Sequence, residues 1–131
     1  MTDSPDTPLH EQGPVIDRAH LDRMTSGDRD LQVEVLGLVR EQASMWVRLL
    51  DPSHETADWL VAAHTIKGSA RGIGAWELAR ICGAAEEAAK GGPLSRDMRR
   101  LWSAQIEVAL DDVMQDIARI EHAIAIASLR T

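Results

Sequence analysis

The spacing of apolar residues along the chain predicts helices and no strands. Apolar residues recur at intervals of three and four positions, and nowhere alternate with the period of two that is typical of a β-strand. A short amphipathic segment over residues 17–26 predicts a first helix. A longer pattern begins after Asp28, a suitable N-cap, and ends before Pro52. The apolar positions that define this second helix are Leu31, Val35, Leu38, Val39, Met45, Trp46 and Leu49.

Three further helices complete the pattern. Ser53 is a suitable N-cap for a third helix, which is expected to end near the glycines of residues 72–74, because glycine adopts the left-handed geometry of a helix terminus without strain. A fourth helix is predicted from about Ala75 to the break at residues 91–93, with Leu78, Cys82, Ala85 and Ala89 facing inward. A last, long helix opens at Ser95, and its apolar stripe consists of Trp102, Ile106, Leu110, Val113, Ile117, Ile120 and Ile124.

These elements predict an all-α fold, an antiparallel four-helix bundle with a short extra helix at its N-terminal end. A chain of 131 residues suits a single domain, because a second core would be too small to be stable. Residues 1–16 carry three prolines and a glycine among polar residues and predict a flexible leader. The bundle is therefore assigned to residues 17–131.

Charge and cysteine content narrow the function. The formal net charge of -7 disfavours nucleic acid as a partner, because binding phosphates requires a basic surface. The sequence shows neither a signal peptide nor an apolar run long enough to cross a bilayer, so we expect a soluble, cytoplasmic protein without a membrane partner. Cys82 is the single cysteine, which excludes an internal disulfide and predicts a buried, unreactive thiol.

One histidine is predicted to face away from the core. Winding residues 59–74 at about 100° per residue gathers a tryptophan, isoleucines and alanines on one side and leaves His64 nearly opposite them. A lone histidine on a helix is most often a structural or solvated residue. Its neighbours decide between that interpretation and a functional one. On the outer face these neighbours are Leu60, Val61, Lys67, Gly68 and Arg71.

The neighbours are unusual for a solvated helix face. A glycine in mid-helix costs about 1 kcal/mol relative to alanine, and exposed apolar residues gain nothing there. Both features are explained if a partner brings its backbone close to the imidazole, with Gly68 clearing the approach and Leu60 and Val61 providing docking surface. A histidine is largely neutral near pH 7, so a ring nitrogen can attack phosphorus. Lys67 and Arg71 would offset the charge of the transferring group.

The segment HTIKGSARGIGA, residues 64–75, resembles the HxxKGS motif of histidine-containing phosphotransfer (HPt) domains. The resemblance implies that His64 is the phosphorylated residue, Lys67 its electrostatic partner and Gly68 the clearance position. Arg71 lies outside the motif, so its role is our inference from the residues alone. Further positions that match the family are Ser69, Gly74 and the L…C…E pattern of Leu78, Cys82 and Glu86.

The resemblance also implies a function and partners. HPt domains are four-helix bundles that relay phosphoryl groups between aspartates of receiver domains, in hybrid histidine kinases and in response regulators. The chain is therefore expected to be a monomeric phosphoryl carrier and not an enzyme, since no glycine-rich ATP-binding loop is visible. We expect no cofactor or metal of its own, and Mg²⁺ in the partner receiver domain.

The residues leave two other functions open. A helical module that docks on a signalling protein without carrying phosphate would use the same surface around Leu60 and Val61. The dimeric histidine domain of a kinase would need an acidic residue directly after the histidine, where this chain has Thr65. Two further expectations concern single positions: the Glu86–Glu87 pair is interpreted as solvated exterior, and Trp76 as a residue that packs between helices and could border the docking surface.

Overall fold

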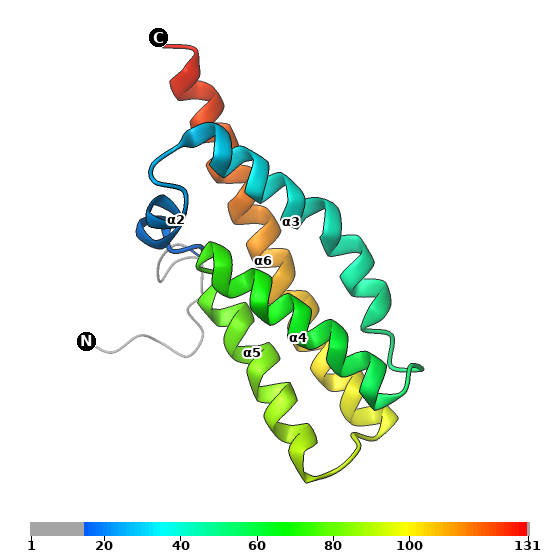
Figure 1. Cartoon of the computed structure of the whole chain (residues 1–131). Coiled ribbons are helices and arrows are strands. Elements are labelled where there is room, and N and C mark those ends of the chain that lie inside the picture. Colours follow the sequence, from blue (N-terminus) through cyan, green and yellow to red (C-terminus); the bar gives the residue numbers. More distant parts are fainter. Residues whose placement is uncertain (1–14, 131) are drawn as a thin grey trace, which may run out of the picture.

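The computed structural model describes residues 15–130 (Figure 1). The leader expected for residues 1–16 lies outside the described part, apart from its last two residues. Both of these pack against the core: Val15 is half-buried and Ile16 is fully buried. They belong with the folded part of the chain, because a buried carboxylate on the last helix accepts a hydrogen bond from the Ile16 backbone.

Helices make up the regular structure of the described residues, which confirms the predicted all-α class. The elements are α2 (Arg18–Met24), α3 (Arg29–Leu49), α4 (Thr56–Ile73), α5 (Trp76–Ala88), the 3₁₀ turn η1 (Ala89–Gly91) and α6 (Arg96–Ser128). Neighbouring contacts run from α3 to α4, from α4 to α5, from α5 to α6 and from α6 back to α3, so these four helices enclose one core (Figure 1). The short α2 packs on α4. None of the helices in residues 15–130 is long and apolar enough to cross a membrane.

Capping residues set where the helices begin and end. The side chains of Asp17, Asp28 and Ser95 accept hydrogen bonds from the first turns of α2, α3 and α6, as the sequence predicts for Asp28 and Ser95. Ser53 is not the N-cap of α4: it bonds Asp51 in the preceding turn, and the helix begins after Glu55. At the other end of α4, Gly74 has φ 82°, the left-handed geometry that favours glycine.

The second helix differs most from its predicted pattern. Of the apolar positions that define it in the sequence, Val39 and Trp46 are buried, Val35 is half-buried, and the others are exposed. The buried face of α3 lies one residue further round the helix and includes a glutamine and an alanine. These buried residues are Gln32, Leu36, Val39, Ala43 and Trp46. The chain thus places apolar residues on an open face of α3.

A buried carboxylate joins the start of the folded chain to the last helix. Asp116 on α6 is 2% exposed, and its Oδ2 accepts a 2.7 Å hydrogen bond from the backbone N–H of Ile16. Its Oδ1 accepts from Arg119 Nε at 3.2 Å and lies 3.6 Å from a guanidinium nitrogen of Arg18. A buried charge is stable only when it is paired in this way.

We predict that Asp116→Ala lowers the free energy of unfolding by about 2 kcal/mol, because it leaves the Ile16 N–H buried without an acceptor and removes two charged contacts. Urea denaturation followed by circular dichroism measures the change. Asp111→Ala, an exposed position on the same helix, is the control and should change the stability by less than about 0.5 kcal/mol. Equal losses in the two variants would contradict the anchoring role of Asp116.

Candidate functional site

His64 lies in the middle of α4, on the side that faces away from the core. The buried side of the helix holds Trp59, Ala62, Ala63, Ile66, Ala70 and Ile73, and these residues fix the rotation of α4 about its axis. That rotation leaves the His64 side chain 70% exposed. The prediction that His64 faces away from the core is therefore confirmed.

Glu86 on α5 determines how the imidazole is held. Its Oε2 lies 2.9 Å from His64 Nδ1, and its Oε1 lies 2.5 Å from Lys67 Nζ. A carboxylate can only accept hydrogen bonds, so Nδ1 must carry the proton that is shared with Glu86. In the neutral ring the lone pair is then on Nε2, the nitrogen that Glu86 does not contact.

The partners of Glu86 favour the ionised form of its side chain. Partial burial acts to raise the pKa of Glu86, but the hydrogen bonds and positive charge of Lys67 and His64 outweigh burial and hold that pKa below its ordinary value of 4.5. The expectation that Glu86 and Glu87 are both solvated exterior is thus wrong for Glu86, whose side chain is 24% exposed, and right for Glu87, at 72%. Spacing in the sequence could have indicated this, since Glu86 lies one helical turn after the inward-facing Cys82 and therefore on the same side of the helix.

The Lys67 side chain is largely buried between α4 and α5. It is 17% exposed, and its aliphatic part passes over Gly83 of α5. The Lys67 Cδ atom lies 3.7 Å from the position that a Cβ atom on Gly83 would occupy. Its ammonium group is shared with Glu86, which neutralises part of its charge. Arg71, three residues further along the sequence than Gly68, is exposed and has no ion pair among the described residues.

The expected docking residues divide between surface and core. Val61 is 65% exposed, and Gly68 is exposed with no atom within 4 Å of the position that a methyl group would occupy, so both border open space beside His64. Leu60 instead is half-buried and packs against the core. Sequence periodicity misplaces it because its rotation on α4 points it toward the packed neighbour and not toward solvent.

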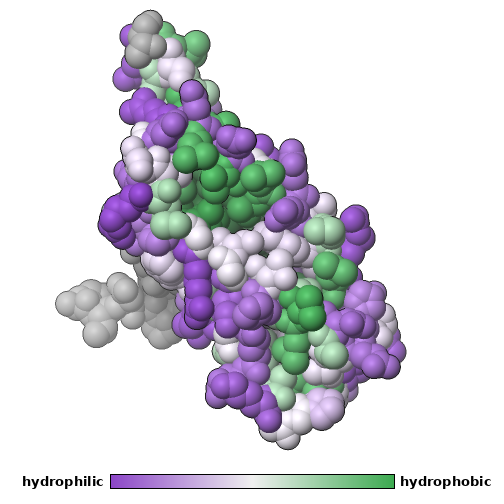
Figure 2. Space-filling view, viewed as in Figure 1, coloured by the Kyte–Doolittle hydropathy of each residue, from purple (hydrophilic) through white to green (hydrophobic). Residues whose placement is uncertain are grey.

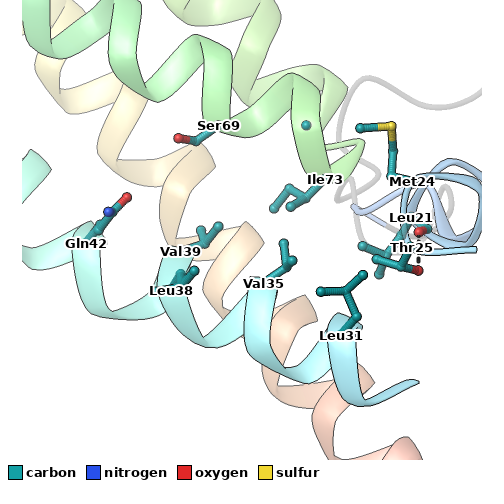
Figure 3. A pocket seen from close by; sticks show the side chains of 11 residues that line it. Leu21, Met24, Thr25, Leu31, Val35, Leu38, Val39, Gln42, Ser69 and Ile73 are labelled. Carbon is teal, nitrogen blue, oxygen red and sulfur yellow. Dashed lines mark hydrogen bonds between the residues drawn. The ribbon is translucent and has the colours of Figure 1, made fainter. Parts of the chain in front are cut away.

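An apolar groove next to this site was not anticipated from the sequence. Between α2, the first half of α3 and the end of α4 there is a cavity of about 340 Å³ that opens to solvent, seen as a hydrophobic area in Figure 2 and from close by in Figure 3. Its α4 wall is made of small residues, Ser69 and Gly72, with Ile73 beneath. The residues that line the rest of it are Leu21, Met24, Thr25, Leu31, Val35, Leu38, Val39 and Gln42.

Two other expectations concern residues near the site. Cys82 is buried beneath it, and desolvation together with the charge of Glu86 raises the pKa of its thiol to about 12, so it is unreactive as expected.

Trp76 is 47% exposed; its indole N–H donates to Asp17 at 3.0 Å and its ring meets His20 edge to face. It ties α2 to the start of α5. Among the described residues no cluster of metal-ligating side chains occurs.

Comparison with known proteins identifies the family of this chain. The Hpt domain family matches residues 34–119, so the chain belongs to that family. The crystal structure of histidine phosphotransferase ShpA from Caulobacter crescentus is similar, with 37% sequence identity and a TM-score of 0.68. The match covers 88% of this chain and 98% of the ShpA chain. No similar sequence was found among curated proteins.

We predict that Glu86 makes the stability of the fold depend on pH. Because its pKa is lower in the folded chain than in the unfolded one, the unfolded chain binds more protons between these two values, and stability rises with pH there. The contribution of Glu86 is present above the unfolded-state pKa of 4.5 and is lost as the pH falls through the folded-state value. Glu86→Gln should therefore be less stable than wild type at neutral pH, with a difference that shrinks at about pH 3.5.

Urea denaturation of both proteins at the two pH values tests this. Glu87→Gln is the matched control and should change the profile little, because its carboxylate is 72% exposed and water screens its pair with Lys90. A Glu86→Gln deficit of the same size at both pH values would contradict the prediction.

Proposed function

We propose that this chain is a histidine phosphotransfer protein of a multistep phosphorelay, which accepts a phosphoryl group on His64 from a receiver aspartate and passes it to the aspartate of a response regulator. Membership of the Hpt family supports the class of function. The observation that carries the residue assignment is the exposed imidazole of His64, held at Nδ1 by Glu86.

The chemistry of the transfer follows from that hydrogen bond. A bond forms between His64 Nε2 and phosphorus, while the bond from phosphorus to the aspartate oxygen breaks and its electron pair leaves with the aspartate carboxylate. The ring becomes positively charged and keeps its proton on Nδ1, where the Glu86 carboxylate stabilises it. The same steps in reverse, with a second aspartate, complete the relay.

Charge at the site comes from both proteins. Lys67 and Arg71 offset the negative charge of the phosphoryl group, and Mg²⁺ in the partner receiver domain does so on the aspartate side. The chain acts as a carrier without an ATP site of its own, as a cytoplasmic monomer. Its partners are the receiver domains of hybrid histidine kinases and response regulators.

The partner docks, in this proposal, along the face shared by α3 and α4. The open stripe of α3 has the alternating spacing of four and three residues with which one helix packs on another. Opposite it, Gly68 and Gly72 of α4 let a partner helix come close beside His64. Glu34 and Glu41, exposed and without ion pairs in residues 15–130, flank the stripe and favour a partner helix with basic residues along one edge. The residues of the stripe are Leu31, Val35, Leu38, Gln42, Met45 and Leu49.

We predict that wild-type chain mixed with phosphorylated receiver domains at neutral pH gains one acid-labile phosphoryl group, and that His64→Gln gains none. Intact mass spectrometry measures both. His54→Gln and His122→Gln are controls that leave His64 in place and should be phosphorylated like wild type. Phosphate on His64→Gln would refute the site, and no gain in wild type from a broad receiver panel, with binding intact, would favour the docking module without phosphate.

We predict that Gly68→Ala separates stability from function. A methyl group at Gly68 meets no atom within 4 Å, so alanine should raise the free energy of unfolding by about 0.5–1 kcal/mol through helix propensity. The same methyl group narrows the approach to His64, so phosphoryl transfer should slow about tenfold, the change that about 1.4 kcal/mol of transition-state energy produces. Thermal unfolding and a transfer time course measure the two effects.

Gly37→Ala is the matched control, because Gly37 lies inside α3, outside the residues that line the groove, and has only a flexible arginine end within 4 Å of a Cβ. It should stabilise the chain similarly and leave transfer unchanged. Equal transfer rates for Gly68→Ala and wild type would contradict the role of Gly68 in partner approach.

A further inference from the structure

The open stripe of α3 contains one polar residue, and that residue faces another polar group across the groove. Gln42 follows Leu31, Val35 and Leu38 at the same helical spacing and precedes Met45. Figure 3 shows its side-chain amide at one end of the groove, across from the hydroxyl of Ser69 on α4. Neither side chain has a hydrogen-bond partner among the described residues. Two unused polar groups thus interrupt an otherwise apolar docking face.

The position of this pair along α4 relates it to the reacting histidine. Ser69 follows His64 by five residues, about 7.5 Å along the helix axis at 1.5 Å per residue. A partner helix that slid along the groove by one turn would move its residues by about 5.4 Å. Phosphoryl transfer requires the reacting atoms to be about 3–3.5 Å apart and in line, so a slip of that size would prevent reaction.

We propose that Gln42, together with Ser69, sets the register of the receiver's helix in the α3/α4 groove by hydrogen bonding to a polar side chain on that helix. This rests on the proposed function, which supplies the partner. Apolar contacts along the stripe are similar in successive registers, because leucine, valine and methionine recur at every turn except the one that holds Gln42. A single polar position in an apolar seam favours the one register in which its hydrogen bonds are made, at some cost in affinity.

The register role makes Gln42 a positioning residue and distinguishes it from one that only adds affinity. Gln42→Leu completes the apolar stripe, so a receiver should bind as tightly as to wild type or more tightly. Transfer at saturating receiver should nevertheless slow at least tenfold, because the complex then spends most of its time in unreactive registers. Gln42→Asn, which keeps the amide on a shorter side chain, should recover part of the rate.

A second measurement detects the register without any phosphoryl transfer. The receiver domain carries a spin label next to its phosphorylatable aspartate, and the paramagnetic broadening of amide signals is recorded along α4 by NMR. With wild-type chain the broadening should centre on His64. With Gln42→Leu it should spread along the helix by about one turn, or 5.4 Å.

Gln105→Leu is the matched control, because Gln105 lies among exposed apolar residues of α6, between Leu101 and Val108, in the groove against α5. It should alter neither transfer nor the broadening pattern. The proposal is overturned if Gln42→Leu transfers at the wild-type rate, if it loses binding and rate in proportion, or if the broadening stays centred on His64. A wild-type chain that binds receivers in one register but takes no phosphate would refute the proposed function and leave the register role standing.

Discussion

Close packing of α4 against α5 is the constraint on which the site depends. Buried residues on the two helices include the alanines Ala63 and Ala70 on α4 and Ala85 on α5, and small residues between helices allow a close approach. The packing brings a glutamate on α5 into contact with both the imidazole and the ammonium group that α4 presents. Larger residues in place of the alanines would strain this packing, because extra volume in a well-packed core forces neighbouring elements to shift.

The Glu86 carboxylate contacts two groups, the His64 imidazole and the Lys67 ammonium group, with a different effect on each. It holds Nδ1 of the imidazole and fixes the tautomer, which leaves the lone pair of the neutral ring on Nε2. It also neutralises part of the positive charge of Lys67, with which it forms an ion pair. Arg71, by contrast, has no ion pair in the part of the chain that the structure describes, so its charge is available without breaking a contact there.

The open face of α3 is an apolar surface next to the stripe that supplies the core. One side of the helix supplies the core through Leu36, Val39 and Trp46, and the next stripe round the helix stays in water. Exposed apolar surface contributes nothing to folding of the free chain and increases the risk of aggregation. It is retained at moderate exposure, in a groove beside glycines of α4, where a partner helix would cover it.

The sequence by itself determined the helices, most of their caps and the outward position of His64, because these depend on local spacing and on residues within one turn of each other. It misplaced the N-cap of α4 and the exposure of Leu60. It also misplaced the buried face of α3, since two adjacent stripes on that helix are equally apolar and only the neighbouring helices decide which stripe is covered. Tertiary structure alone decided that Glu86 joins His64 to Lys67, and that Gln42 and Ser69 line the same groove. Both arrangements involve residues on different helices, and helix periodicity carries no information about which residues of two helices come together.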